Sequence, residues 1–311
     1  MAVQIETVAY GGWSQCTRLF NDEIELIVTT QVGPRIIRCG FIGGPNLMCE
    51  RPEEMGQSGG EDFRLYGGHR LWHAPEHPNR TYYPDNAPVT ISTHAGGVVF
   101  TSPIETTTRL QKSLSVLLHP SRPQVRIGHS ITNHHPWAVT FAPWALSVMR
   151  AGGVAIIPLP ERVSHEHNLL PTYTMTFWPY TNMADPRWTW GERYVLLRHD
   201  AQAAAPQKIG VWTDQGWLAY VNDKTLFIKT FQVDATATYP DYNSPTEVFT
   251  NQTFTEMETL GPLRSLESGA WVDHEETWHL VRDVASPQND ADVSSMILPH
   301  IPPHITNRSH E

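Results

Sequence analysis

The side chains with the most evident capacity for chemistry gather between residues 66 and 77. This segment reads Tyr66-Gly67-Gly68-His69-Arg70-Leu71-Trp72-His73-Ala74-Pro75-Glu76-His77. His69 and His73 are four positions apart, a spacing that places both imidazoles on one face of a helix or a strand. The pattern favours acid–base chemistry beside a stacking Trp72, or a metal site in which Glu76 or His77 joins the two histidines. The remaining alternative is a loop whose histidines hydrogen-bond to the backbone.

A second pattern lies on the predicted strand Thr253–Leu260. With a period of two residues, Glu256 and Glu258 share one face of this strand with two apolar side chains. Like charges on an otherwise apolar face are costly unless they are bound to something. The pair therefore predicts either a carboxyl group with a raised pKa, which suits a general acid, or ion pairing with Lys or Arg on a neighbouring strand.

Aromatic side chains are concentrated in the irregular stretch Pro171–Trp190, which contains Trp178, Trp188 and Trp190. Tryptophan in a polar loop is a plausible platform for a sugar, because the apolar C–H face of the sugar packs on the indole ring. The alternative is a satellite core beneath a long loop.

The composition narrows the class of partner. The 311 residues include 22 Lys+Arg and 32 Asp+Glu, a formal net charge of −10, and only 17% of the residues are charged. Without a basic block, this balance excludes a nucleic-acid surface. No apolar run approaches the roughly 20 residues of a membrane span, so we expect no membrane partner. Low charge with many polar and aromatic residues favours an uncharged polar ligand.

The start of the sequence and its cysteines predict a cytoplasmic location. The first residues show neither a basic segment nor the apolar segment of a secretory signal. Cys16, Cys39 and Cys49 are odd in number and lack CxxC spacing, which is typical of free thiols in a reducing compartment.

Short β-type runs with Gly/Pro turns dominate the sequence and predict an all-β sandwich or barrel. The predicted strands are Glu23–Thr30, Arg35–Phe41, Thr107–Leu118, Gln124–Thr132, Ala138–Met149, Arg193–Arg198, Lys208–Thr213, Leu218–Val221, Leu226–Phe231, Thr246–Thr250, Thr253–Leu260 and Glu275–Val281. We expect the strands around residues 211, 217 and 226 to form a three-stranded antiparallel meander.

The rest of the chain is expected to be irregular in two places. Glu50–Asn86 is rich in Gly, His, Pro and Tyr, and a loop of that length is usually functional. We predict one domain over residues 1–282 and an extended or partly disordered tail over 283–311.

Several motifs in one order resemble an uncharacterised bacterial branch of the galactose mutarotase-like superfamily, over roughly residues 5–282. They are the early strand pair Glu23–Phe41, the segment Gly67–Trp72, Ala142–Met149 followed by Gly152-Gly153, Tyr239-Pro240-Asp241, and Glu256–Pro262. The resemblance implies a large antiparallel β-supersandwich with a concave sugar-binding face. Its members include aldose 1-epimerases, and the same sandwich occurs in glycoside hydrolases and polysaccharide lyases.

The resemblance also assigns roles to residues, with one departure. Where aldose epimerases carry a catalytic Glu ahead of a Pro-Asp…Asn motif, this sequence has Lys229. A protonated lysine does not act as a base, so Glu256 or Glu258 would replace it, and Lys229 would instead bind an acidic sugar.

For mutarotation we expect Glu258 and one of His69 and His73 to supply base and acid, and a glycosidase or lyase on the same scaffold would use the same residues. Trp72 and Trp178 would stack on the sugar, and the residues expected to grip its hydroxyls are Arg35, Arg70, Tyr239 and Asp241. In this hypothesis the catalytic candidates His69, His73, Lys229 and Glu258 converge in one cleft. The expected partner is a small carbohydrate or oligosaccharide, neutral or acidic, and no cofactor is expected.

Two other classes of function stay open. A non-catalytic carbohydrate-binding domain would keep the aromatic residues without a close acid–base pair, and the Lys at position 229 favours it. A metal-dependent enzyme would use His69 and His73.

Overall fold

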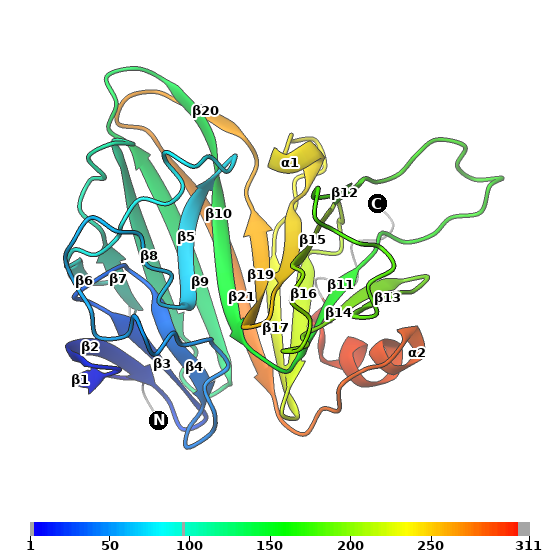
Figure 1. Cartoon of the computed structure of the whole chain (residues 1–311), viewed down its shortest axis with the longest axis horizontal. Coiled ribbons are helices and arrows are strands. Elements are labelled where there is room, and N and C mark those ends of the chain that lie inside the picture. Colours follow the sequence, from blue (N-terminus) through cyan, green and yellow to red (C-terminus); the bar gives the residue numbers. More distant parts are fainter. Residues whose placement is uncertain (1–2, 95–96, 304–311) are drawn as a thin grey trace.

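The computed structural model describes residues 3–94 and 97–303, which form two antiparallel β-sheets packed against each other (Figure 1). About 46% of the chain is strand and 5% is helix. The all-β architecture predicted from the sequence is thus confirmed. Among the described residues, no helix has the length and apolar character needed to cross a membrane.

The first sheet carries Trp72, Glu256 and Glu258, which the sequence singles out. Its strands follow the spatial order β1 (Gln4–Tyr10), β2 (Trp13–Phe20), β3 (Ile24–Thr29), β4 (Ile36–Phe41), β5 (Gly68–Ala74), β10 (Val139–Arg150), β19 (Phe254–Leu260), β18 (Thr246–Thr250), β15 (Gln207–Val211) and β12 (Met175–Phe177). A short strand, β20 (Arg264–Leu266), pairs with the beginning of β10. Figure 1 shows β5, β10 and β19 side by side near the middle of this sheet.

The second sheet closes the other side of the core. Its strands follow the order β13 (Trp188–Trp190), β14 (Tyr194–Arg198), β11 (Val154–Pro158), β16 (Trp217–Asn222), β17 (Thr225–Phe231), β21 (Trp271–Val281), β9 (Gln124–Asn133), β8 (Leu110–Leu118), β7 (Gly97–Thr101) and β6 (Thr90–His94). Side chains from both sheets, such as Leu26, Met257, Phe227 and Trp278, form the largest hydrophobic core.

Residues 284–303 pack on the second sheet instead of extending as a tail. Helical turns cover α2 (Asp290–Asp292), Val293–Ile297 and Leu298–His300. Val293 and Ile297 are buried against the outer face of the sheet, in a cluster with Trp217 and Ile228. The sequence prediction missed this because the apolar positions are few and separated by Pro, Ser and Asn. Residues 304–311 of the predicted tail lie outside the described residues. The four residues of α1 (Pro240–Asn243) form a turn at the end of the first sheet.

Two predictions about strands need correction. The segment Glu50–Asn86, expected to be irregular, contains the central strand β5, which pairs with β10 along seven residues. The expected meander is also only partly present. β16 and β17 form an antiparallel hairpin whose turn residues Asp223 and Lys224 have positive φ, but β15 pairs with β18 and β12 in the first sheet.

Glycine sets the entry of the chain into β5. Gly68 has a φ of +73°, and a Cβ atom there would lie 2.5 Å from the carbonyl oxygen of Ile36 on β4. A side chain at position 68 would therefore push β5 away from its neighbour. Because His69 and Arg70 follow directly, this glycine fixes which face of the sheet each of them occupies.

We predict that Gly68→Ala lowers the free energy of unfolding more than Gly43→Ala does. Gly43 has a φ of +70°, but nothing lies within 4 Å of its would-be Cβ atom, so Gly43→Ala carries the backbone strain alone. That strain costs roughly 1–2 kcal/mol, and we expect the clash at Gly68 to add at least about 1 kcal/mol. Urea unfolding of the two variants measures the difference, and equal losses would contradict the close approach of β5 and β4.

Candidate functional site

Successive residues of β5 point to opposite faces of the first sheet, and this alternation divides the predicted site residues. His69 points inward and contacts His129 of β9 in the other sheet. Arg70 and Glu258 both point outward. Leu146 of β10 lies between them, paired with Arg70 of β5 on one side and with Glu258 of β19 on the other. The expectation that His69, His73, Lys229 and Glu258 converge in one cleft is therefore wrong, because the sheet itself lies between Glu258 and the other three.

The inward histidines form a closed chain of hydrogen bonds. His129 Nδ1 lies 2.9 Å from the carbonyl oxygen of His274, which can only accept, so Nδ1 carries the proton. In neutral His129, Nε2 must then accept a hydrogen bond from His69 Nε2 at 2.7 Å. His69 Nδ1 in turn accepts from the Ser147 hydroxyl at 2.8 Å. Burial lowers the pKa of both His69 and His129, which keeps them neutral.

Lys229 lies in the same interior network. Its ammonium group is 2.9 Å from Glu276 Oε1 and donates to the carbonyl oxygen of Met257 at 3.1 Å, and the side chains of Lys229 and Glu276 are fully buried. Thr259 and Trp278 also donate to Glu276. Burial lowers the pKa of Lys229, while Glu276 opposes that shift. Lys229 thus neutralises a buried carboxylate within the protein, which corrects its expected placement at a sugar site.

The histidine pair considered for a metal is not brought together. On a strand rising about 3.3 Å per residue, the Cα atoms of His69 and His73 are about 13 Å apart. His73 instead packs against Phe141, and burial lowers its pKa well below the usual value. The ligand-type atoms of His69, His129 and Glu276 do lie within 4.8 Å of one another. These atoms already bond to each other or to Lys229, so the geometry describes a hydrogen-bonded network.

The outer face of the first sheet carries a second group of buried charges, which we call the outer-face cluster. It consists of Arg70, Trp144, Lys208, Glu247, Glu256 and Glu258, from β5, β10, β15, β18 and β19. Pairing register aligns Glu247 with Glu258 on adjacent strands. The alternation of side chains along β19 thus directs Glu256 and Glu258 to the same face of the sheet, as the sequence predicts.

Lys208 and Trp144 hold Glu258 through one of its oxygens. The Lys208 ammonium lies 2.9 Å from Glu258 Oε2 and 2.7 Å from Glu247 Oε2. The Trp144 indole N–H donates to the same Glu258 oxygen at 2.7 Å. Among the described residues, Glu258 Oε1 has no hydrogen-bond partner although it is buried. A buried carboxylate oxygen without a donor is unusual in a folded protein.

The other two acids of the cluster favour their protonated forms. Burial and the neighbouring Glu258 raise the pKa of Glu256 to about 8. Burial likewise raises the pKa of Glu247 well above its usual value, although Lys208 acts in the opposite direction. Glu256 is partly exposed, so the outer face presents a protonated carboxyl group beside the contact between Glu258 and Lys208.

Aromatic side chains border the outer-face cluster. The Lys208 ammonium lies 4.7 Å from the ring centroid of the partly exposed Trp178, and Tyr180 and Asp241 lie at the same end. At the other end, Arg70 stacks on Trp72 and Phe63, with its guanidinium carbon 4.0 Å and 5.0 Å from the ring centroids. Trp72, Trp178, Arg70, Asp241 and Glu256 are thus the predicted binding residues that the fold brings to this face.

Arg35 and Tyr239 serve the protein's own structure. Arg35 is buried, pairs with Asp85 and donates to the carbonyl oxygens of Leu65 and Gly67. The hydroxyl of Tyr239 accepts a hydrogen bond from the backbone N–H of Asp234 at 2.8 Å. The two tryptophans Trp188 and Trp190 stack on each other at 5.0 Å on β13 of the second sheet, away from the outer-face cluster.

The sequence prediction missed Lys208, Glu247 and Trp144. A signal existed for Glu247, since it interrupts the buried strand β18 in the same way that Glu258 interrupts β19. The sequence offers no such signal for Lys208, because its partners Glu247 and Glu258 lie 39 and 50 positions further along the chain.

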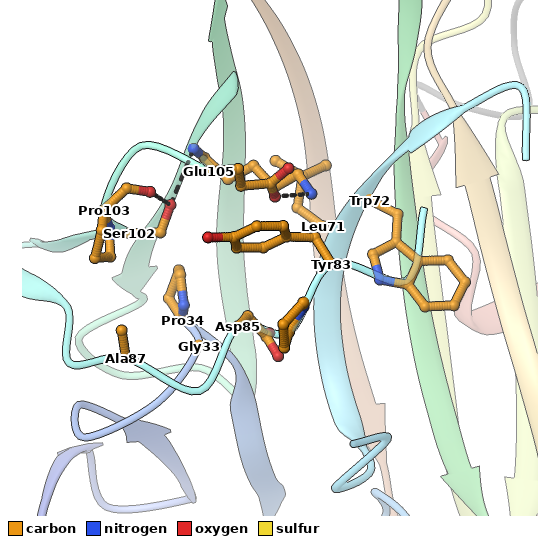
Figure 2. A pocket seen from close by; sticks show the side chains of 12 residues that line it. Gly33, Pro34, Leu71, Trp72, Tyr83, Asp85, Ala87, Ser102, Pro103 and Glu105 are labelled. Atoms are coloured by element: carbon orange, nitrogen blue, oxygen red, sulfur yellow. Dashed lines mark hydrogen bonds and ion pairs between the residues drawn. The ribbon is translucent and has the colours of Figure 1, made fainter. Parts of the chain in front are cut away.

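A small pocket near β5 does not fit a sugar (Figure 2). Gly33, Pro34, Leu71, Tyr83 and Asp85 line it, together with the buried ion pair of Lys112 and Glu105. Its volume of about 60 Å³ is well below the roughly 300–1,000 Å³ of ligand pockets. A larger, open pocket of about 850 Å³ lies between the loops that carry Gly60, Tyr82 and Thr106.

We predict that Lys229→Met lowers the free energy of unfolding by about 3–5 kcal/mol, because it leaves the Glu276 carboxylate buried without its cation. Adding Glu276→Gln should restore part of the loss. Lys224→Met, at an exposed turn position, is the control and should change stability by less than about 0.5 kcal/mol. Denaturant unfolding measures all three variants. A Lys229→Met protein as stable as the control would contradict the interior ion pair.

Comparisons with known proteins agree on the fold. No protein-family model matches the chain, and no curated protein matches it. A proposed aldose 1-epimerase from Klebsiella pneumoniae superposes with a TM-score of 0.58 at 12% identity, over 94% of this chain and 85% of that one. A galactose mutarotase-like protein from Lactobacillus casei gives a TM-score of 0.56 at 10% identity, over 86% and 100%.

A TPR-domain containing protein from Parabacteroides distasonis also matches, with a TM-score of 0.57 at 11% identity over 88% of this chain. The chain spans 48% of the length of that protein. At these identities the comparisons concern the fold. The chain has the galactose mutarotase-like β-supersandwich fold that the sequence resemblance predicts.

Proposed function

We propose that this protein binds a small carbohydrate at the outer-face cluster and interconverts its anomers by acid–base catalysis. The observation that carries the proposal is the pair Glu256 and Glu258, one partly exposed with a pKa near 8 and one ion-paired with Lys208. Paired carboxyl groups with different protonation states are what such a reaction needs. Sugar-related names among the structural neighbours of this fold support the substrate class.

In the proposed reaction Glu258 is the base and Glu256 the acid. The free Oε1 of Glu258 takes the proton from the anomeric hydroxyl, while protonated Glu256 gives its proton to the ring oxygen. The bond between C1 and the ring oxygen breaks, and an open-chain aldehyde forms. After rotation about the C1–C2 bond, the two carboxyl groups reverse their roles, the ring closes with the opposite configuration, and both return to their initial states.

Trp178 is suited to position the sugar, and Trp144 positions Glu258. Their rings lie 4.7 Å and 4.9 Å from the Lys208 ammonium, so one cation lies close to both indoles. Trp178 is partly exposed and offers its ring to an apolar sugar face, whereas Trp144 is buried and orients Glu258.

Non-catalytic carbohydrate binding is the second candidate, and the full burial of the Glu258 side chain favours it. A binding domain would use the same aromatic and charged residues without turnover. Binding without anomer interconversion would select this candidate.

We predict that Glu258→Gln reduces the rate of anomer interconversion at least about 100-fold while the variant still binds the sugar. The amide keeps the shape of the side chain but takes up no proton from the anomeric hydroxyl. Polarimetry of freshly dissolved hexoses and hexuronates measures the rate. Glu275→Gln is the matched control, because Glu275 lies on the surface and pairs with Arg126. Equal rates for the two variants would remove Glu258 from the mechanism.

We predict that the activity falls as the pH rises through about 8. Glu256 acts in its protonated form, which predominates below its pKa of about 8 and disappears above it. The raised pKa also makes the protonated carboxyl favour the folded state, so this contribution to stability declines between the usual Glu pKa and pH 8.

The Glu256→Gln variant gives a readout of Glu256 that does not depend on activity. Its free energy of unfolding, relative to that of the wild type, should be higher at pH 9 than at pH 5. Urea unfolding at the two pH values measures this difference. The assignment of Glu256 would be contradicted if the stability of the variant relative to wild type were the same at both pH values. It would also be contradicted if the rate of anomer interconversion in the wild type did not change up to pH 9.

A further inference from the structure

Arg70 is a buried cation without a partner. Its side chain is 1% exposed, and its Nε, Nη1 and Nη2 atoms have no hydrogen-bond partner among the described residues. Cation–π contacts with Trp72 and Phe63 are its main attractive interactions. A buried guanidinium group with five unused N–H donors is costly, and proteins normally supply it with an acceptor.

The neighbouring Arg35 differs from Arg70 because both of its terminal nitrogens have partners, although its Nε has none among the described residues. Arg35 pairs with Asp85 and donates to two backbone carbonyl oxygens. Only Oδ2 of Asp85 is engaged by Arg35, while Oδ1 has no hydrogen-bond partner among the described residues. Asp85 favours the charge on Arg70, whereas Arg35 disfavours it. Burial and Arg35 lower the pKa of Arg70 to about 9, so Arg70 is still a cation at neutral pH.

In the outer-face cluster, the positive charge of Arg70 has no matching negative charge. The Lys208 ammonium is matched by the Glu258 carboxylate at 2.9 Å. Glu247 and Glu256 favour their neutral, protonated forms because of desolvation and the neighbouring Glu258. Within the cluster, the guanidinium group is therefore the one charge that lacks a counter-ion.

One tyrosine packs against the two aromatic rings that cover Arg70. Tyr82 makes edge contacts with Phe63 and Trp72, the two rings that stack on Arg70, and is 38% exposed. The same tyrosine lines the open pocket of about 850 Å³. Tyr82 therefore contacts both this pocket and the rings that cover the guanidinium group.

We infer that the sugar bound at the outer-face cluster carries an oxyanion, a carboxylate or a phosphate, and that Arg70 binds it. This inference rests on the proposed function. Arg70 and Glu258 lie on the two strands that flank β10, so their Cα atoms are about 10 Å apart. One end of the ligand thus meets the acid–base pair while its charged substituent meets the planar fork of Arg70, which matches carboxylate and phosphate oxygens.

Binding measurements on Arg70→Met and wild-type protein test the inference. The probes are D-glucuronate, D-galacturonate, D-glucose 6-phosphate and D-galactose 6-phosphate, with D-glucose and D-galactose as neutral counterparts and acetate and inorganic phosphate as anion controls. We expect wild type to bind at least one acidic sugar more tightly than its neutral counterpart. The Arg70→Met substitution should weaken that binding about 10- to 100-fold and leave neutral sugars unaffected. The carboxylate and phosphate probes distinguish the two kinds of oxyanion.

The stability of the ligand-free variant separates ligand binding from a structural role. Removing an unpaired buried charge should leave the melting temperature of Arg70→Met unchanged or higher. Arg126→Gln, at an exposed surface position, is the control and should change neither stability nor binding. A large loss of stability in Arg70→Met would overturn the inference.

The binding outcomes also distinguish failure of this inference from failure of the proposed function. Neutral sugars that bind as tightly as acidic ones, with no effect of Arg70→Met, would overturn the role of Arg70 and leave the proposed function standing. If none of the six sugars binds, both the proposed function and the role of Arg70 are wrong.

Discussion

The alternation of side chains across the first sheet is the constraint on which the site depends. β5 and β19 each carry polar residues at successive positions, and the sheet sends them to opposite faces. His69 enters the core while Arg70 faces outward, and Thr259 enters the core while Glu258 faces outward. Polar side chains thus lie on both faces of the first sheet, and the two faces differ in whether those groups have partners within the protein.

Around Glu276 the polar atoms of the core are matched to one another. Glu276 receives hydrogen bonds from Lys229, Thr259 and Trp278, and His69 and His129 complete a chain that ends at a carbonyl oxygen. On the outer face the matching is incomplete, because Glu258 Oε1 and three nitrogens of Arg70 remain without partners among the described residues. An unpaired buried polar group is costly. An acceptor on Glu258 and donors on Arg70, both without partners on one face, are best explained by a ligand that carries both a donor and an acceptor.

Much of this could be predicted from the sequence, and the failures have physical causes. A period of two residues correctly placed Glu256 and Glu258 on one face, and the sequence resemblance correctly predicted the fold. The same period cannot tell which face is the core, so His69 and Lys229 were assigned to the site although they lie in the interior. β5 was taken for a loop because Gly67, Gly68 and Pro75 punctuate it. Lys208 escaped notice because its partnership with Glu258 is created by strand pairing between distant parts of the chain.

The central claim is that a sugar binds on the outer face of the first sheet, between Trp178 and Arg70. A crystal structure of the protein soaked with D-galacturonate, and one soaked with D-galactose, tests it most directly. The claim predicts sugar density on that face, with an oxygen atom within hydrogen-bonding distance of Glu258 Oε1. A sugar confined to the pocket beside Gly60 and Thr106, with no contact to Glu256 or Glu258, would contradict it.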